Sequence, residues 1–186
     1  MKRLVDLILL LMISIPSIVI SLIICIVIKI TSKGPILFWS DRVGKNGKIF
    51  KMAKFRSMHI GTPVIATHLM DDPDKYLSKV GSFLRKTSLD ELPQLISVLK
   101  GQMSFVGPRP ALFNQKDLIY LRKKEGIDEL TPGITGWAQI NGRDELNISE
   151  KVKHDKYYLN NKSLFFDLRI IFFTIVMVIK RDGVRH

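Results

Sequence analysis

A long apolar stretch near the N-terminus constrains the fold of this chain more than any other feature. Residues 4–28 are apolar or small apart from Asp6. As one helix, this stretch would extend about 38 Å, which exceeds the hydrocarbon core of a bilayer at about 30 Å. We therefore expect the stretch to be embedded in a membrane.

Three topologies are compatible with this stretch. A signal peptide fits Lys2 and Arg3, but no small-x-small cleavage site ends the apolar run. A straight spanning helix fits the length. A re-entrant helix, which enters, breaks and returns, fits Pro16 between Ser14 and Ser17, because nearby serines can satisfy the carbonyl groups that proline frees. Basic residues flank both ends, which favours the cytoplasmic side for each. The residues alone leave the spanning and re-entrant topologies open.

The net charge of the chain indicates an anionic partner. The 186 residues carry a formal net charge of +12, which suits nucleic acid, a phosphorylated substrate or anionic lipid. The length is enough for one domain with a core. The single cysteine, Cys25, excludes a disulfide framework and a thiolate metal site.

Residues 35–55 predict a basic β-hairpin. Strand-like residues 36–39 and 48–52 flank Asn46-Gly47, and Asn-Gly is a strong signal for a hairpin turn. The lysines of this segment form either a solvated face or a surface that binds phosphate groups.

Residues 85–94 place two adjacent acids at the start of a helix. Asp90 and Glu91 precede apolar residues at helical spacing. Ser88 and Glu91 match a capping box, which is a purely structural role. Pro93 instead favours Asp90 as the N-cap residue, because proline is tolerated in the first turn. In that register Asp90 lies beside free backbone N–H groups, where a phosphate can also bind.

Two further segments carry signals that are weaker when taken alone. In residues 107–110, two prolines flank Arg109. They stiffen the loop, so that it holds Arg109 in place at little cost in conformational entropy. A guanidinium can bind a phosphate group through two parallel hydrogen bonds. The alternative is a turn with an exposed arginine. Residues 164–179 are apolar, interrupted by Asp167 and Arg169, and predict an interfacial or core helix.

Together these motifs resemble the small monotopic phosphoglycosyl transferases, bacterial sugar transferases that start glycan assembly on polyprenol phosphate. The chain resembles the minimal catalytic unit, without the additional spanning helices of larger members. The matching motifs occur in the family's order: the apolar segment with Pro16, residues 51–58, residues 88–94, residues 107–110, residues 132–136 and residues 141–143. In one departure, Pro16 follows Ile15 where the family commonly has Ser-Pro.

The resemblance implies an α+β fold that is mainly helical. Residues 1–30 would form a re-entrant membrane anchor, a helix-break-helix with its break at Pro16. Residues 31–186 would form a catalytic domain with a β-hairpin packed with helices and with interfacial amphipathic helices, including a C-terminal one. The expected location is the bacterial cytoplasmic (inner) membrane, with the catalytic domain on the cytoplasmic face.

The resemblance also implies a reaction. A sugar-1-phosphate would pass from a UDP-sugar to polyprenol phosphate, expected to be undecaprenyl phosphate, with release of UMP. This step would initiate assembly of a capsule, O-antigen, exopolysaccharide or glycoprotein glycan. Asp90 would attack the β-phosphorus and form a covalent phosphoryl-aspartate, which polyprenol phosphate then attacks. Mg²⁺ is the expected cofactor, with Asp90 as first ligand and Glu91 as second ligand or acid/base.

Four cations are expected to contact the substrate phosphates: Arg85 and Arg109, with Lys54 and Arg143 behind them. The expected partners are the UDP-sugar, polyprenol phosphate and the cytoplasmic leaflet, without nucleic acid, and a homodimer is an open alternative. The rival function is a non-catalytic, membrane-tethered basic module that binds acidic lipid or nucleic acid. That rival leaves Asp90 and Glu91 unexplained. The sequence does not specify the sugar.

Overall fold

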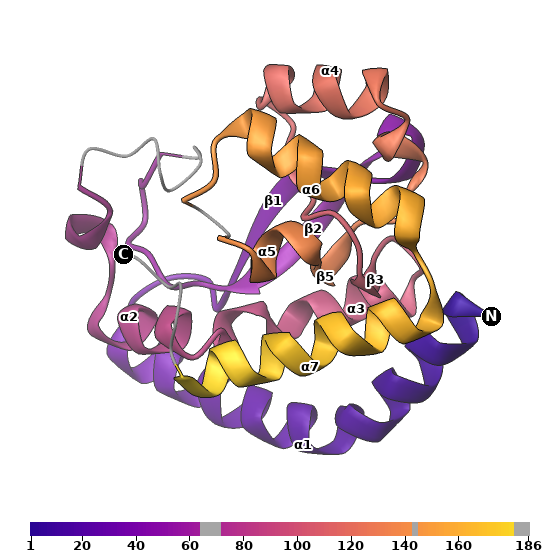
Figure 1. Cartoon of the computed structure of the whole chain (residues 1–186). Coiled ribbons are helices and arrows are strands. Elements are labelled where there is room, and N and C mark those ends of the chain that lie inside the picture. The colour runs from indigo at the N-terminus through magenta and orange to yellow at the C-terminus, as the bar shows by residue number, and fades with distance from the viewer. Residues whose placement is uncertain (64–71, 143–144, 181–186) are drawn as a thin grey trace.

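The computed structural model describes residues 1–63, 72–142 and 145–180 and has the mainly helical α+β architecture that the sequence predicts (Figure 1). Its elements in chain order are α1 (Lys2–Thr31), β1 (Leu37–Val43), η1 (Lys45–Gly47), β2 (Ile49–Phe55), η3 (Pro73–Tyr76), α2 (Lys79–Lys86), η4 (Leu89–Gln94), α3 (Leu95–Leu99), β3 (Ser104–Val106), β4 (Ala111–Leu112), α4 (Lys116–Lys124), η5 (Ile127–Glu129), β5 (Gly133–Thr135), α5 (Trp137–Ile140), α6 (Ile148–Asn161) and α7 (Leu164–Lys180).

Helix α1 runs through the whole apolar stretch without interruption. Among the described residues, it is the one helix long and apolar enough to cross a membrane by length and composition. Pro16 lies inside it, and the helix is bent (Figure 1). The structure thus differs from the expected helix-break-helix, because helical conformation continues through the proline. A single proline removes one backbone hydrogen bond and can bend a helix without ending it.

Both ends of α1 contact the same folded body. Near its start, the Arg3 guanidinium donates to two backbone carbonyl groups at the end of α3. The buried Asp6 carboxylate accepts from Ser104 Oγ of β3 at 2.9 Å. Near its end, Ile24 and Ile28 pack in a core cluster with side chains of β2 and α2. The one acid in the apolar stretch is therefore buried against protein.

The predicted β-hairpin is confirmed. Strands β1 and β2 are antiparallel, with Leu37 opposite Phe55 and Val43 opposite Ile49. The turn between them needs a left-handed backbone at Asn46 (φ 56°), which asparagine tolerates better than most residues. Strand β4 pairs with the other edge of β1, and β3 pairs with β5 in a separate parallel ladder.

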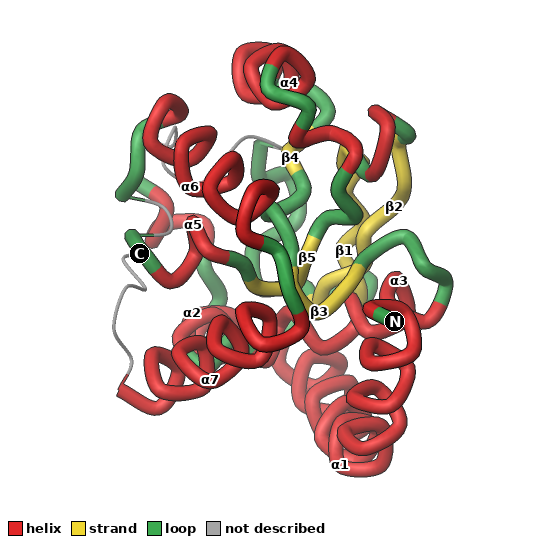
Figure 2. The backbone as a smooth tube through the Cα atoms, turned by 45° about the vertical axis from the view of Figure 1, so that its right-hand side comes forward, coloured by secondary structure: helices red, strands yellow, loops and turns green. Residues whose placement is uncertain are grey.

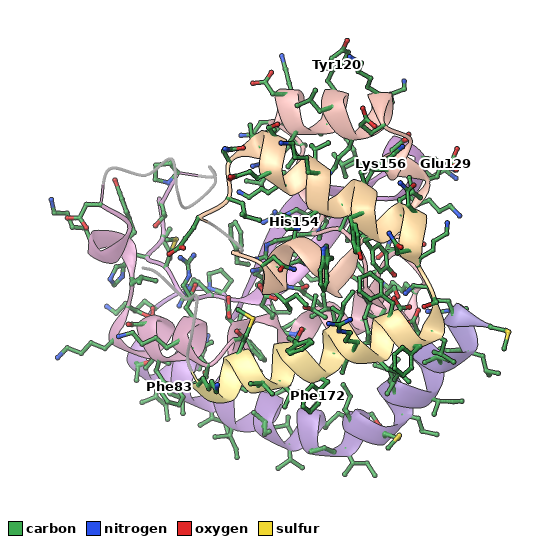
Figure 3. All side chains as sticks on the ribbon, viewed as in Figure 1. Phe83, Tyr120, Glu129, His154, Lys156 and Phe172 are labelled. Atoms are coloured by element: carbon green, nitrogen blue, oxygen red, sulfur yellow. The ribbon has the colours of Figure 1, made fainter. Side chains whose placement is uncertain are left out.

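One side of the molecule exposes apolar side chains. Helices α1 and α7 lie along this side, and α4 lies at the opposite side (Figures 1 and 2). Phe83 of α2 and Phe172 of α7 lie on the α1 side, whereas Tyr120 of α4 lies far from it (Figure 3). Phe83 is 57% exposed and Phe172 is 62% exposed, and Ile15 in the middle of α1 is 74% exposed. An apolar surface of this kind needs a partner other than water.

Candidate active site

The chain reaches the predicted catalytic acids through a sharp turn. After α2, Ser88 adopts the left-handed conformation (φ 55°), and η4 and α3 follow directly. Ser88 makes no side-chain capping bond, so the capping-box prediction is wrong. The prediction that Asp90 is the N-cap residue is also wrong, because the turn at Ser88 starts η4 before Asp90 and places the acid inside this 3-10 helix. The helical segment after the turn was correctly predicted.

Packing of η4 against β2 brings a lysine to the two acids. Lys54 Nζ lies 2.7 Å from Glu91 Oε1 and 3.9 Å from Asp90 Oδ2. Arg109 Nη2 donates to the same Glu91 oxygen at 3.0 Å. Asp90 is 5% exposed and Glu91 is 9% exposed. A single glutamate oxygen thus holds two cations beside a buried aspartate.

Burial and the nearby cations act in opposite directions on the pKa of Asp90. Burial raises the pKa of the Asp90 carboxyl above 3.8, and the positive charge of Lys54 opposes the rise. The negative charge of Glu91 adds to the rise, while Arg85 and Arg109 oppose it. Burial also lowers the pKa of Lys54 below 10.5, against the charges of Glu91 and Asp90. The cations therefore favour the ionised carboxylate that a nucleophile needs.

Arg85 reaches the same region from the last turn of α2. Its Nε donates to Ser57 Oγ at 3.0 Å, just after the end of β2. Its positive charge opposes the rise in the pKa of Asp90. The structure thus brings together Asp90, Glu91, Lys54, Arg85 and Arg109 from four separate segments of the chain. The fourth predicted phosphate ligand, Arg143, lies outside the described residues.

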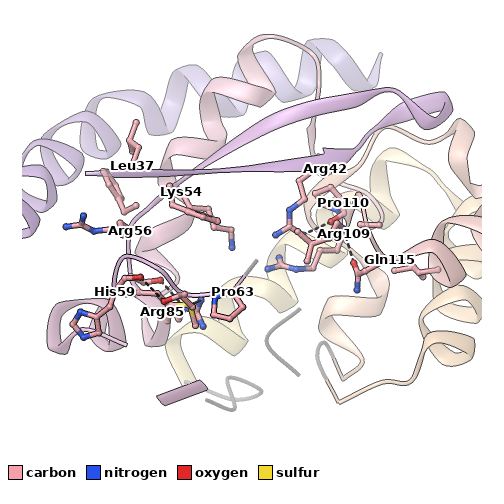
Figure 4. A pocket seen from close by; sticks show the side chains of 18 of the residues that line it. Leu37, Arg42, Lys54, Arg56, His59, Pro63, Arg85, Arg109, Pro110 and Gln115 are labelled. Carbon is pink, nitrogen blue, oxygen red and sulfur yellow. Dashed lines mark hydrogen bonds between the residues drawn. The ribbon is translucent and has the colours of Figure 1, made fainter. Parts of the chain in front are cut away.

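A pocket of about 370 Å³ opens beside this cluster (Figure 4). Its polar wall is strongly basic, and the cations that line it are Arg42, Lys54, Arg56, Arg85, Arg109, Arg122 and Lys151. Lys54 and Arg109, which contact Glu91, are part of this wall. A pocket with this charge suits a ligand with more than one phosphate group.

Two partly buried arginines, Arg42 and Arg122, hold the proline-rich loop that carries Arg109. Arg122 of α4 donates to the Arg109 carbonyl oxygen at 2.7 Å, and Asp155 of α6 accepts two bonds from the same guanidinium, at 2.7 and 3.0 Å. Arg42 of β1 donates to the carbonyl oxygen of Pro110 at 3.1 Å. Burial and the nearby charge of Arg109 lower the pKa of Arg42 to about 10.

Sequence reasoning missed Arg42, Arg122 and Asp155. Strand alternation places Arg42 on the same face of β1 as Ser40, to which it donates at 3.1 Å, and this was the one available signal. The Arg122–Asp155 pair spans 33 positions of sequence, and no local pattern connects the two residues.

The two adjacent acids are compatible with a magnesium ion, which commonly takes one or two carboxylates and completes its shell with water and substrate phosphates. Within residues 1–63, 72–142 and 145–180, no group of three or more Asp, Glu, His or Cys side chains could hold a metal by itself. Asp90 and Glu91 therefore fit a cation shared with a phosphorylated substrate, and they do not form a closed protein site.

Comparisons with known proteins identify the family of this chain. The family model for bacterial sugar transferases matches residues 1–181. The chain is 44% identical over 162 residues to the UDP-glucose:undecaprenyl-phosphate glucose-1-phosphate transferase of Escherichia coli, which covers 82% of this chain and 34% of that protein. It is 38% identical over 168 residues to the undecaprenyl-phosphate galactose phosphotransferase of Salmonella typhimurium (81% of this chain, 34% of that protein).

A third relative is similar in length. The uncharacterized sugar transferase EpsL of Bacillus subtilis is 41% identical over 160 residues, which cover 86% of this chain and 78% of that protein. The chain thus spans most of EpsL but about a third of the two enterobacterial relatives. The chain belongs to the bacterial sugar transferase family, and its predicted resemblance to that family is confirmed.

Proposed function

We propose that this protein transfers a sugar-1-phosphate from a UDP-sugar to polyprenol phosphate and releases UMP. The observation that carries the proposal is the buried Asp90 carboxylate with Lys54 Nζ at 3.9 Å, in a family whose named relatives use undecaprenyl phosphate. The named relatives transfer glucose or galactose phosphates at similar identity, so the likeness does not select the sugar.

The substrate diphosphate would compete with Glu91 for the two cations. Lys54 and Arg109 line the pocket and are bound to Glu91 Oε1 at 2.7 and 3.0 Å. A diphosphate that enters the pocket attracts both, and they then stabilise the charge that develops on the phosphoryl oxygens. In this role Glu91 positions the cations, in addition to the two roles predicted from the sequence.

The proposed chemistry has two displacement steps. In the first, an Asp90 carboxylate oxygen attacks the β-phosphorus of the UDP-sugar, and the bond between that phosphorus and the oxygen of UMP breaks. In the second, an oxygen of polyprenol phosphate attacks the same phosphorus, the aspartyl bond breaks, and a polyprenyl diphosphate sugar leaves. Ionised Asp90 is needed at the start and is regenerated at the end.

Asp90 and Glu91 would hold Mg²⁺ together with phosphate oxygens of the substrate. When bound, the ion supplies positive charge that neutralises the diphosphate. Asp90 is the first-choice ligand, because Glu91 Oε1 already accepts from Lys54 and Arg109.

We propose that α1 is re-entrant and that the catalytic domain lies on the cytoplasmic leaflet. Arg3 and Asp6 at one end of α1, and Ile24 and Ile28 at the other, contact one folded body, which supports placing both ends on one side of the membrane. The exposed apolar surface of α1 and α7 supports contact with lipid. Residues 1–30 would then serve as the anchor and residues 31–186 as the catalytic domain.

The test is a panel of UDP-sugars with the full chain in membranes that contain polyprenol phosphate. The proposal predicts acceptor-dependent release of UMP from one or a few members of the panel. The rival function, a non-catalytic basic module, predicts salt-sensitive binding of nucleic acid or acidic lipid without UMP release.

A further inference from the structure

The two ends of the pocket differ in chemistry. Strand β1 runs along the pocket, with Leu37 and Phe38 near its start and Arg42 near its end. Phe38 and Arg42 lie on the same face of the strand and, at about 3.3 Å per residue, roughly 13 Å apart. Figure 4 shows the same order, with Leu37 at one end, Arg42 and Gln115 toward the other, and Lys54 between them.

The end near Leu37 carries most of the apolar side chains of the pocket, and Arg56 lies beside them (Figure 4). Arg56 is 7% exposed, and its Nη2 donates to the backbone carbonyl and the hydroxyl of Ser32. The apolar lining residues there are Pro35, Leu37, Phe38, Phe55 and Ile60. Phe38 is 40% exposed and Ile60 is 70% exposed, so both leave apolar surface open toward the pocket that they line. A group of exposed apolar side chains beside a row of cations suits a ligand that has both an apolar chain and a phosphate group.

This apolar end adjoins the end of the membrane helix. Residues 32–36 connect α1 directly to β1, and Leu37 packs against the cluster that contains Ile24 and Ile28 of α1. The Ile60 side chain lies against Gly34 in this connection, where an added Cβ would be 2.6 Å from Ile60 Cδ1. The apolar end of the pocket is therefore the end nearest to α1, the helix that the proposed function places in the bilayer.

Lys54 is the cation that faces Phe38 across the hairpin. It stands directly opposite Phe38 in the ladder of β1 and β2, so the two side chains lie on the same face of the sheet. Lys54 Nζ is also 3.9 Å from Asp90 Oδ2. A ligand with an apolar chain on Phe38 and a phosphate at Lys54 would thus present that phosphate to Asp90.

We infer that the apolar end of the pocket binds the first isoprene units of the lipid acceptor. The nucleotide then takes the opposite end, near Arg42 and Gln115. This inference rests on the proposed function. It goes further because it assigns the two substrates to opposite ends of one pocket and names Phe38 as the residue that contacts the lipid chain.

The test compares Phe38→Ser with Trp39→Ser in the full chain, reconstituted in vesicles with polyprenol phosphate. Trp39 is 51% exposed, follows Phe38 in the strand and points to the opposite face, so it is a matched control. Loss of apolar contact should raise the KM for polyprenol phosphate about tenfold in Phe38→Ser. Its KM for the UDP-sugar should stay the same, Phe38→Leu should restore most of the affinity, and Trp39→Ser should change neither KM.

Other outcomes overturn the inference. A rise in the KM for the UDP-sugar alone would place the nucleotide on Phe38. Equal effects of Phe38→Ser and Trp39→Ser, or weaker sedimentation of Phe38→Ser with vesicles that lack polyprenol phosphate, would mean that Phe38 contacts the bilayer and not the acceptor. If the unsubstituted chain turns over but Phe38→Ser matches it in both KM values, the inference alone fails. If the unsubstituted chain releases no UMP, the proposed function fails as well.

Discussion

Glu91→Gln tests whether one carboxylate holds the two cations of the site. Glu91 Oε1 accepts from Lys54 Nζ at 2.7 Å and from Arg109 Nη2 at 3.0 Å, and its side chain is 10% exposed. Glutamine keeps the shape and one carbonyl acceptor but removes the negative charge. Lys54 and Arg109 then remain close together with less compensation, so each should move away from its present position.

The structure allows a rough estimate of the loss of stability in Glu91→Gln. A hydrogen bond to a charged group contributes about 1.5–3 kcal/mol to the free energy of unfolding. The substitution weakens two such bonds but does not remove them, so we expect the free energy of unfolding to fall by about 2–3 kcal/mol. For a chain of this length that corresponds to a Tm lower by about 4–12 °C. Displacement of the two cations should also lower kcat/KM by about 10- to 100-fold and leave partial turnover.

Thermal unfolding and UMP release measure the two effects. Glu125→Gln is the matched control, because Glu125 forms an ion pair with Lys156 at 3.5 Å but is 41% exposed. An exposed pair contributes about 0–1 kcal/mol, so this variant should stay close to the unsubstituted protein in Tm and in rate. If Glu91→Gln lowers the Tm no more than Glu125→Gln does, Glu91 does not hold the cations as described.

Three further predictions concern the loop, the pH profile and the membrane helix. Asp155→Asn should lower the free energy of unfolding by about 3–5 kcal/mol and lower the Tm, because the largely buried Arg122 guanidinium loses its carboxylate partner. An unchanged melting curve would mean that this ion pair does not stabilise the loop. The rate of UMP release should rise with pH through the raised pKa of Asp90, as the carboxylate ionises, and fall again as Lys54 loses its proton through a pKa below 10.5; a flat profile would exclude both assignments. Cysteines introduced near either end of residues 4–28 should resist labelling from the periplasmic side, whereas labelling at one end would indicate a spanning helix.

The hairpin and the acid–cation cluster follow from short-range signals. Asn46-Gly47 specified the turn, and the conformation at Asn46 is the left-handed one that such a turn requires. Asp90, Glu91 and Arg109 were identified from their local sequences, and the structure brings them together with Lys54. The family resemblance, more than any single pattern, selected these residues over the other acids and cations of the chain.

Other features depend on tertiary contacts that no local pattern reveals. The left-handed turn at Ser88 and the 3-10 start of the helix could not be read from a sequence that fits a capping box well. Asp6, the one acid in the apolar stretch, is buried and accepts from Ser104, which is 98 positions away. In the same way, the support of the Arg109 loop by Arg122 depends on a contact between α4 and α6, and sequence spacing does not predict it.

The most direct test of the proposed mechanism is to trap the covalent intermediate on Asp90. The full chain is incubated with a UDP-sugar labelled at the β-phosphorus, without acceptor, and the labelled peptide is identified by mass spectrometry. The account predicts a sugar-phosphate adduct on Asp90 that is discharged by polyprenol phosphate and is absent in Asp90→Asn, which should also lose turnover. Near-normal turnover of Asp90→Asn, or a label on another residue, would contradict it.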